Sequence, residues 1–211
     1  MKIEQAETLA GDADLDLPEF DDPPADPLKL LDLRLREARE RGVREPQALA
    51  LATADADGRP SVRVVLLKQV GSALVFTTDS RSRKGRELAA RPWAAGTLHW
   101  RETLQQVVLE GPVRQMTGPE SDALFAARPR AAQAVAIASG QGEPVDDPEQ
   151  LQAAAAEIAA GDAPLTRPPD WSGYELIPEG VEFWHGSPDR LHRRLRYARA
   201  GDGWAHQRLQ P

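Results

Sequence analysis

The chain has 211 residues, a formal net charge of −7 at pH 7 and no cysteine. This length is typical of one domain and allows a buried core without a disulfide or a metal ion. The lack of cysteine excludes disulfides, cysteine-ligated zinc and thiol catalysis. The chain has neither the start of a signal peptide nor the roughly 20 consecutive apolar residues of a membrane span, so we expect a cytoplasmic protein without membrane contact.

The negative charge is concentrated at the start of the chain. Residues 1–26 hold nine acidic residues and one lysine, and the remaining residues are close to neutral. Prolines at 18, 23 and 24 add to this composition, which is typical of a flexible arm. We therefore expect an acidic N-terminal arm over 1–26 and a single domain over 27–211. A near-neutral body argues against binding of nucleic acid.

The first predicted elements are a helix and a hairpin. Asp26-Pro27 precedes a helical pattern of Leu28, Leu31, Leu35 and Ala38, which predicts an N-capped amphipathic helix ending near Gly42. Residues 48–53 and 61–68 read as strands. Asp57-Gly58 between them is a strong hairpin signal.

The middle of the chain alternates between strands and short helices. We expect a strand over 74–78, a helix over 82–90 that stops before Pro92, and strands over 93–100 and 104–115. Thr117 and Glu120 form a capping box that opens a helix to about Ala127, and we expect a further helical segment over 131–138.

In the last part of the chain we expect an alanine-rich helix over 148–160, followed by strands over 173–177, 181–184, 190–199 and 203–209. Consecutive strands joined by short helices favour an α+β fold, mainly β, in which an antiparallel sheet or barrel carries flanking helices. Neither a Rossmann fingerprint nor a P-loop occurs, and the four histidines form no zinc signature, so we expect no metal.

Two segments carry candidate binding residues. Arg63 and Lys68 flank one predicted strand, and Ser82, Arg83 and Lys84 open the helix that follows. A helix N-terminus with a hydroxyl and adjacent cations can hold a phosphate, although a solvated strand and an ordinary basic turn would have the same composition.

The second segment lies near the end of the chain. If residues 190–197 form a strand, Arg190, His192 and Arg194 share one face, where they would suit an anion or the polar edge of a flavin, or a solvated surface with ion pairs. Trp184 could wall an aromatic ligand and Gln106 could bind its polar edge, although each residue type is also common in cores and on surfaces.

Several motifs in order resemble the pyridoxine/pyridoxamine 5′-phosphate oxidase family, which depends on flavin mononucleotide (FMN). These motifs are Pro24-Ala-Asp-Pro27, Arg63-Val-Val-Leu-Leu-Lys68, Ser82-Arg-Lys84, Gln106, Arg128-Pro-Arg130, Glu182-Phe-Trp184 and Arg190-Leu-His192-Arg-Arg194. The resemblance implies a six-stranded antiparallel split β-barrel with flanking helices. It also implies a homodimer with FMN at the subunit interface and dioxygen as the electron acceptor.

The resemblance assigns roles to individual positions. It implies catalytic and substrate-covering roles for Arg190 and His192, and substrate binding by Lys68 and Arg128. The residues it implies for FMN binding are Arg63, Leu66, Leu67, Lys68, Thr77, Thr78, Ser82, Arg83, Lys84, Gln106, Gln141, Trp184 and Arg194.

The substrate expectation depends on departures from the family pattern. Leu124 and Ala132 replace a tyrosine and a serine that usually help to hold the substrate phosphate, whereas Trp100-Arg-Glu-Thr103 and Gln105-Gln106 resemble the flavin oxidases of phenazine biosynthesis. The leading hypothesis is therefore an oxidase that transfers a hydride from a dihydrophenazine carboxylic acid to FMN. The alternatives are a pyridoxine/pyridoxamine 5′-phosphate oxidase that makes pyridoxal 5′-phosphate, and a flavin-binding protein without catalysis.

Overall fold

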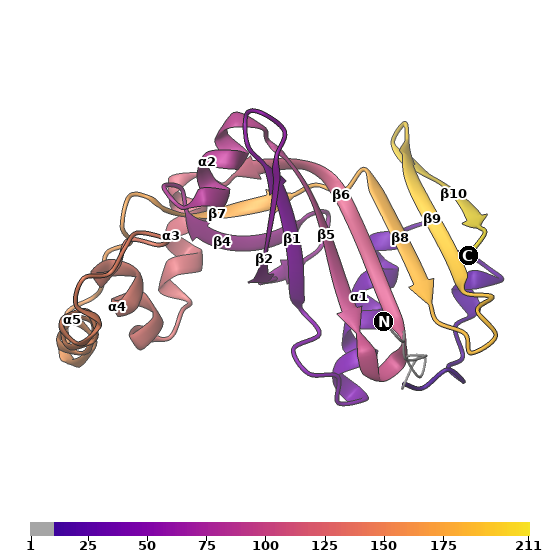
Figure 1. Ribbon diagram of the computed structural model, residues 1–211, viewed down its shortest axis with the longest axis horizontal. Helices are drawn as coiled ribbons and strands as arrows, with labels where there is room; N and C mark the ends of the chain where they lie inside the picture. The colour runs from indigo at the N-terminus through magenta and orange to yellow at the C-terminus, as the bar shows by residue number, and fades with distance from the viewer. Residues whose placement is uncertain (1–10) are drawn as a thin grey trace, which may run out of the picture.

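A computed structural model describes residues 11–211, in which ten strands and five α-helices form an α+β fold built around antiparallel pairing (Figure 1). The helices are α1 (Pro27–Glu40), α2 (Arg83–Ala90), α3 (Gly118–Ala126), α4 (Arg130–Ala138) and α5 (Pro148–Ala160). The strands are β1 (Ala48–Ala54), β2 (Pro60–Leu66), β3 (Gln69–Val70), β4 (Leu74–Asp79), β5 (Trp93–Trp100), β6 (Gln105–Gln115), β7 (Trp171–Leu176), β8 (Gly180–His185), β9 (Arg193–Ala200) and β10 (Gly203–Leu209).

The sheet is organised around β6. Its first part pairs with β8 and its last part with β7, while β5 runs along its other side. The strand order is β10-β9-β8-β6-β5-β1-β2, and β7 continues through β4 to β3. Within the described residues β2 and β4 form no ladder with each other, so the sheet does not close. The predicted count of six strands is not confirmed.

Local signals explain where most elements begin and end. The Asp26 carboxylate accepts hydrogen bonds from Leu28 N and Lys29 N at the start of α1. Glu120 completes the predicted capping box by accepting from Thr117 N at 2.7 Å. Gly58 has a φ of 84°, which is the left-handed conformation that the β1–β2 turn requires. These predictions are confirmed.

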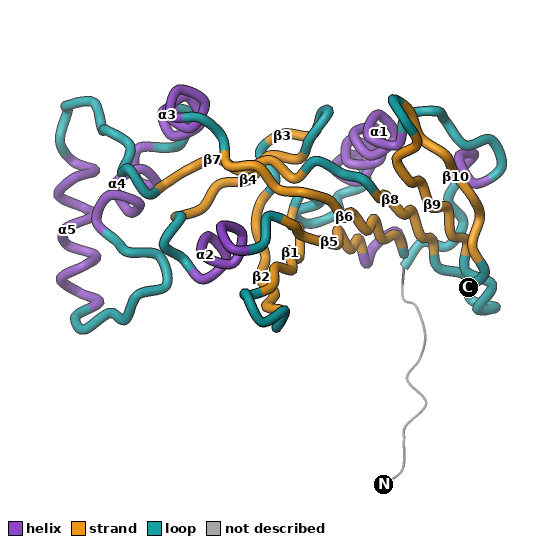
Figure 2. Tube along the Cα trace, turned by 90° about the horizontal axis from the view of Figure 1, so that it is seen from above, coloured by secondary structure: helices purple, strands orange, loops and turns teal. Residues whose placement is uncertain are grey.

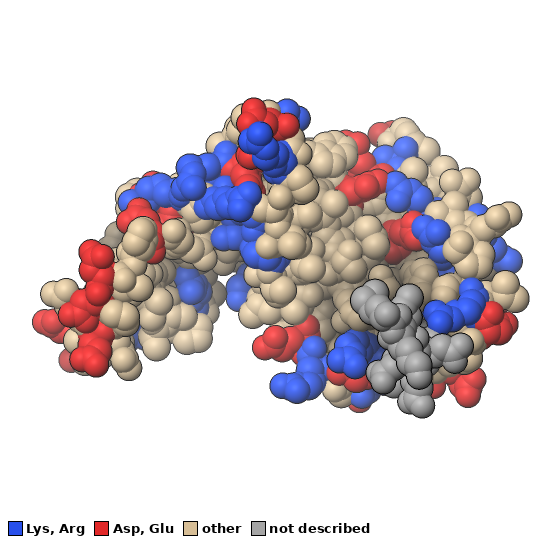
Figure 3. All heavy atoms as spheres, in the orientation of Figure 1, with Lys and Arg blue, Asp and Glu red and all other residues tan. Residues whose placement is uncertain are grey.

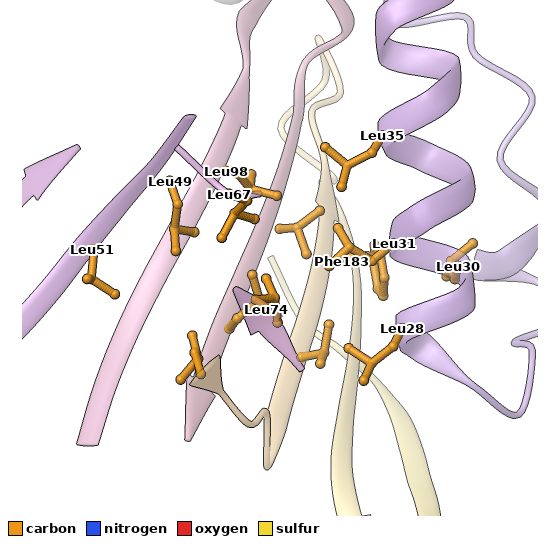
Figure 4. Packing of buried hydrophobic residues seen from close by; sticks show 14 of the residues in the cluster. Leu28, Leu30, Leu31, Leu35, Leu49, Leu51, Leu67, Leu74, Leu98 and Phe183 are labelled. Carbon is orange, nitrogen blue, oxygen red and sulfur yellow. The ribbon is translucent and has the colours of Figure 1, made fainter. Parts of the chain in front are cut away.

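The main core lies between α1 and the sheet. Leu28, Leu31 and Leu35 of α1 point toward buried side chains of the strands, including Leu98 and Phe183 (Figure 4). This is the face that the predicted helical spacing marked as apolar. The buried stripe of α1 therefore covers one face of the sheet.

The predicted acidic arm divides at residue 10. Residues 1–10 lie outside the described residues. Leu17 and Phe20 are buried in the same core as α1, and Phe20 lies 4.6 Å below the Arg193 guanidinium. Tyr197 donates a hydrogen bond to Pro24 O at 3.0 Å. Residues 17–24 therefore pack against the body of the protein.

The prediction of a strand from Arg190 is wrong at its beginning. A turn occupies residues 187–190, in which Arg190 N donates to Ser187 O and Arg190 has a φ of 70°. The Asp189 carboxylate also accepts from Leu191 N. These local hydrogen bonds hold the turn, so that β9 begins at Arg193. Arg190 therefore does not share a strand face with Arg194.

Helices α4 and α5 form a lobe at one end of the molecule, opposite the β9–β10 hairpin (Figure 2). Arg130 holds the lobe together, because its guanidinium donates to Ile158 O, Ala159 O and Ala163 O at the end of α5. No helix within residues 11–211 is long and apolar enough to cross a membrane.

Candidate functional site

The first candidate site is a cluster of cations beside α2, called the cation pocket below. It consists of Arg63 on β2 together with Ser82, Arg83 and Lys84 at the start of α2, and it includes Thr78 and Gln141. Figure 3 shows Lys and Arg side chains gathered around α2 and over the recess beside it. Sequence analysis predicted an anion site from Arg63, Ser82, Arg83 and Lys84, and the family resemblance implied Thr78 and Gln141.

The chain turns sharply from β4 into α2 at this site. The Ser82 hydroxyl caps the helix by accepting from Gly85 N at 3.3 Å. A Cβ on Gly85 would lie 2.3 Å from Ser80 O, so a side chain at position 85 would push the helix away from the backbone of residues 79–80. Glycine therefore lets the amino end of α2, with its partial positive charge, lie directly beside β4.

Lys84 is the most enclosed cation of the pocket, with 9% of its surface exposed. Its ammonium donates to Thr78 Oγ1 at 2.9 Å and to Gln141 Oε1 at 3.3 Å. Burial, followed by repulsion from Arg63, lowers the pKa of Lys84 below the usual value for a lysine. A buried cation held by neutral oxygens is well suited to an incoming anion.

Arg63 is held by a network that sequence analysis missed. Its guanidinium donates to Thr53 Oγ1 at 2.5 Å, to Leu51 O at 3.3 Å, to Glu87 Oε2 at 3.2 Å and to the Ser61 hydroxyl. The register of the β1–β2 hairpin places Thr53 opposite Ser61. Only this pairing, together with the docking of α2, reveals the network.

The second candidate site is a row of side chains across three strands, called the cross-strand row below. Gln106 on β6 lies opposite Trp184 on β8, and Trp184 lies opposite Arg194 on β9. Directly opposed residues project from the same face of an antiparallel sheet. The structure therefore brings together three predicted residues, of which the first and the last are 88 positions apart in the sequence.

His192 adjoins this row. Its ring lies 4.8 Å from that of Trp184, and its Nδ1 accepts a hydrogen bond from Ser187 N at 3.0 Å. In a neutral imidazole the proton is then on Nε2. Arg194 is oriented by Glu182, whose carboxylate accepts from its Nε at 2.8 Å. Arg190 is exposed in the preceding turn.

The remaining predicted residues lie on β2, on β4 and after α3, outside the hydrogen-bond network of the cation pocket. Leu66 is exposed at the end of β2, Leu67 after it is buried, and Lys68 is exposed. Thr77 is half-buried on β4 beside Thr78. Arg128 follows α3 and its guanidinium lies 5.0 Å above the Trp171 ring. Burial lowers the pKa of Arg128.

The cation pocket and the cross-strand row are far apart within one chain. Gln106 lies near the start of β6, whereas Gln115, nine residues later, pairs with β7 next to β4. Nine residues of a strand span up to about 30 Å. In both views α2 and the β8–β9 pair lie on opposite sides of β5 and β6 (Figures 1 and 2). One chain therefore does not place both groups around one small ligand.

The face of the sheet that carries the cross-strand row also exposes apolar side chains. Val62 and Val64 on β2 are 70% and 65% exposed, and Leu66 is 41% exposed. Val64 lies opposite Ala50, Ala50 opposite Thr97, and Thr97 opposite Val108 on β6. Val108 is two residues from Gln106, so both project from the same face of β6. The row and these side chains thus share one sheet face.

The described residues contain no group of histidine and carboxylate side chains that could hold a metal ion. His185, for example, is buried on β8, and burial lowers its pKa. The donor set of the protein instead consists of guanidinium, ammonium, hydroxyl and amide groups, which suit phosphates and carboxylates.

Two family models match the chain. Residues 35–163 match "Pyridoxamine 5'-phosphate oxidase", and residues 171–211 match "Pyridoxine 5'-phosphate oxidase C-terminal dimerisation region". The second match covers β7 to β10 and thus includes Trp184, His192 and Arg194. This match indicates a homodimer.

Curated relatives extend over nearly the whole chain. The dihydrophenazinedicarboxylate synthase of Burkholderia lata is 46% identical and covers 100% of both chains, and that of Pseudomonas chlororaphis is 45% identical over 98% of this chain and 93% of its own. The pyridoxine/pyridoxamine 5′-phosphate oxidase of Gluconobacter oxydans is 44% identical over 89% of this chain and 95% of its own.

A solved structure has the same fold throughout. The crystal structure of PhzG from Burkholderia lata 383 in complex with tetrahydrophenazine-1-carboxylic acid has a TM-score of 0.92 and 46% identity, and covers 95% of this chain and 100% of that chain. An FMN-binding protein from Nostoc punctiforme shares the fold at 20% identity, with a TM-score of 0.71.

Proposed function

Because the chain belongs to the pyridoxamine 5′-phosphate oxidase family, we propose that it is an FMN-dependent oxidase of a dihydrophenazine carboxylic acid. The observation that carries the proposal is full-length similarity to dihydrophenazinedicarboxylate synthases, together with the close match to a structure that holds a tetrahydrophenazine carboxylic acid. The substrate is a reduced aromatic N-heterocycle that bears carboxylates.

The cation pocket fits the phosphate of FMN. Lys84, Arg63 and Arg83 would supply positive charge, and the amino end of α2 would supply backbone donors. The Ser82 hydroxyl, which here donates to Asp79 O at 2.6 Å, would turn to donate to the phosphate. Thr78 and Gln141 border this site. Together with Thr77, Leu66 and Leu67 they would contact the rest of the cofactor. Lys68 lies two residues after the strand that carries Arg63.

The cross-strand row fits the flat, polar-edged flavin ring. Trp184 offers an aromatic wall, and Gln106 and Arg194 offer donors to ring oxygens and nitrogens. Since the row is distant from the cation pocket of its own chain, each FMN would bind between the pocket of one copy and the row of another. The exposed Val62, Val64 and Leu66 support contact of this sheet face with a second copy.

Substrate would bind over the flavin, between cations and the turn before β9. Lys68 and Arg128 would pair with substrate carboxylates, and the His192 Nε2–H and the Arg190 guanidinium would cover the heterocycle. The apolar Leu124 and Ala132 leave the substrate pocket without two hydroxyl donors, which suits an aryl carboxylate better than a phosphate. FMN held there would supply a hydride acceptor for the substrate, and dioxygen, reduced to hydrogen peroxide, would return it to the oxidised form.

Anaerobic reduction of the bound flavin tests this function. We expect a dihydrophenazine carboxylic acid to bleach the oxidised-flavin absorbance rapidly, and pyridoxine and pyridoxamine 5′-phosphates to bleach it far more slowly. Rapid bleaching by the B6 phosphates would identify the pyridoxine/pyridoxamine 5′-phosphate oxidase activity, which the retained Lys68 and Arg128 favour. Bound flavin that none of these donors reduces would mean a flavin-binding protein without catalysis.

A further inference from the structure

Glu87 is a buried carboxylate directly behind the cation pocket. It lies one turn after Arg83 in α2, and its side chain is 4% exposed. One carboxylate oxygen accepts from Arg83 Nε at 2.8 Å. The other accepts from Arg63 Nη2 at 3.2 Å, from the Ser61 hydroxyl at 2.6 Å and from the Thr53 hydroxyl. Two guanidiniums from different elements thus meet on one acidic group.

Glu87 is ionised at neutral pH. Burial by itself raises the pKa of a carboxyl, but the hydrogen bonds from Ser61, Thr53, Arg83 and Arg63 outweigh burial and lower the pKa of Glu87 to about 2. The negative charge is therefore a permanent part of the pocket. It partly neutralises the three neighbouring cations, so that the net positive charge of the pocket is close to the charge that balances a phosphate dianion.

Glu87 is not itself a group that would bind the phosphate. An acidic side chain would repel a phosphate, and all of its hydrogen bonds come from the protein. Its contact to Arg83 uses Nε only, and the hydrogen bonds of the described residues leave both Nη groups of Arg83 available. Glu87 therefore fixes the guanidinium at one edge while the other edge can meet an anion.

We propose that Glu87 is a positioning residue: it orients the Arg83 guanidinium toward the phosphate of FMN, and it locks the guanidinium of Arg63, whose Nη groups are engaged by the protein, so that its Nε faces the phosphate. This inference rests on the proposed FMN site and adds a residue that does not itself touch the cofactor. Its consequence is phosphate selectivity, because a flavin without phosphate makes no use of the oriented guanidiniums.

The test compares FMN with riboflavin, which lacks the phosphate. Apoprotein of the full chain is titrated with each flavin, and quenching of flavin fluorescence gives the dissociation constants. For Glu87→Gln we expect the dissociation constant of FMN to rise about 10- to 100-fold, as is typical when hydrogen bonds of charged groups are lost. The constant of riboflavin should change less than about twofold, since only the phosphate contacts are affected.

Two further variants make the comparison specific. Thr53→Val removes one hydrogen-bond acceptor of Arg63 without changing side-chain volume much, so we expect a smaller loss in the same direction. Glu175→Gln is the matched control, because Glu175 accepts two hydrogen bonds from Arg114 on a surface of β7 outside the pocket. Its affinities for both flavins should equal those of the wild type.

The outcomes separate this inference from the proposed function. Unchanged or tighter binding of FMN by Glu87→Gln would overturn the positioning role, because removal of a nearby negative charge would then outweigh any loss of orientation. Parallel weakening of FMN and riboflavin would also overturn it, since that pattern indicates general damage. A wild-type apoprotein that binds neither flavin would refute the FMN site itself.

Discussion

Replacing Lys84 with methionine is expected to weaken FMN binding by about 10- to 100-fold, which corresponds to the loss of a charge-assisted hydrogen bond. Methionine keeps the length and apolar stem of the side chain and removes only the ammonium. Lys84 is buried and already contacts Thr78 and Gln141, so it is held in place before the phosphate arrives. The dissociation constant of FMN, measured by fluorescence quenching, checks this prediction.

The same lysine makes the affinity dependent on pH. Burial and the neighbouring Arg63 lower the pKa of Lys84, so its charge is lost at a lower pH than that of an ordinary lysine. Wild-type affinity for FMN should therefore fall as the pH rises through this pKa, whereas Lys84→Met should lack that alkaline decrease. Lys29→Met, on the exposed surface of α1, is the control. Equal FMN affinity of Lys84→Met and wild type would contradict the assignment of the pocket.

Replacing His192 with alanine is expected to reduce kcat/KM for the reduced phenazine substrate by about 100-fold, the loss typical of one misplaced or missing catalytic group. The imidazole is fixed by Trp184 and by the hydrogen bond from Ser187 N, so that Nε2–H is directed by the protein before substrate binds. Stopped-flow measurement of flavin reduction under anaerobic conditions reports this step.

A second histidine provides the control for this variant. His206 lies on β10 and contacts Tyr197, outside the cross-strand row, so His206→Ala should keep the wild-type rate. Flavin content of both variants should be measured beside the rate, because Trp184 adjoins His192. Full activity of His192→Ala with bound FMN would remove this residue from the site.

Much of the fold could be predicted because its signals are local. The Asp26 cap, the Asp57-Gly58 turn, and Pro92 after α2 each act within a few residues, and the structure places element boundaries near them. The strand prediction was wrong at Arg190 because the backbone there forms a turn, which the alternation of side chains does not reveal. The turn is held by hydrogen bonds from Arg190 N to Ser187 O and from Leu191 N to the Asp189 carboxylate.

The site was less predictable because it depends on register and docking. Family resemblance named Gln106, Trp184 and Arg194, but only strand pairing shows that they form one row. Glu87 is a charged residue in the middle of a short helix, and its burial follows from the packing of α2 against the β1–β2 hairpin. No local pattern indicates that a carboxylate will be surrounded by two arginines.

The most direct test of the account is a mixed dimer of two variants. One chain carries Lys84→Met and the other carries Arg194→Gln, each chain has its own affinity tag, and the doubly tagged dimer is purified. If each site combines the cation pocket of one copy with the cross-strand row of the other, one of the two sites contains both defects and the other contains none.

Flavin titration and anaerobic flavin reduction are then measured on this mixed dimer. The account predicts that the mixed dimer binds FMN with wild-type affinity at about half of its sites. Dimers of either variant alone should have no site of wild-type affinity. If pocket and row instead served the same flavin within one chain, both sites of the mixed dimer would be defective. Its FMN affinity would then stay at the level of the single variants, which would contradict the account.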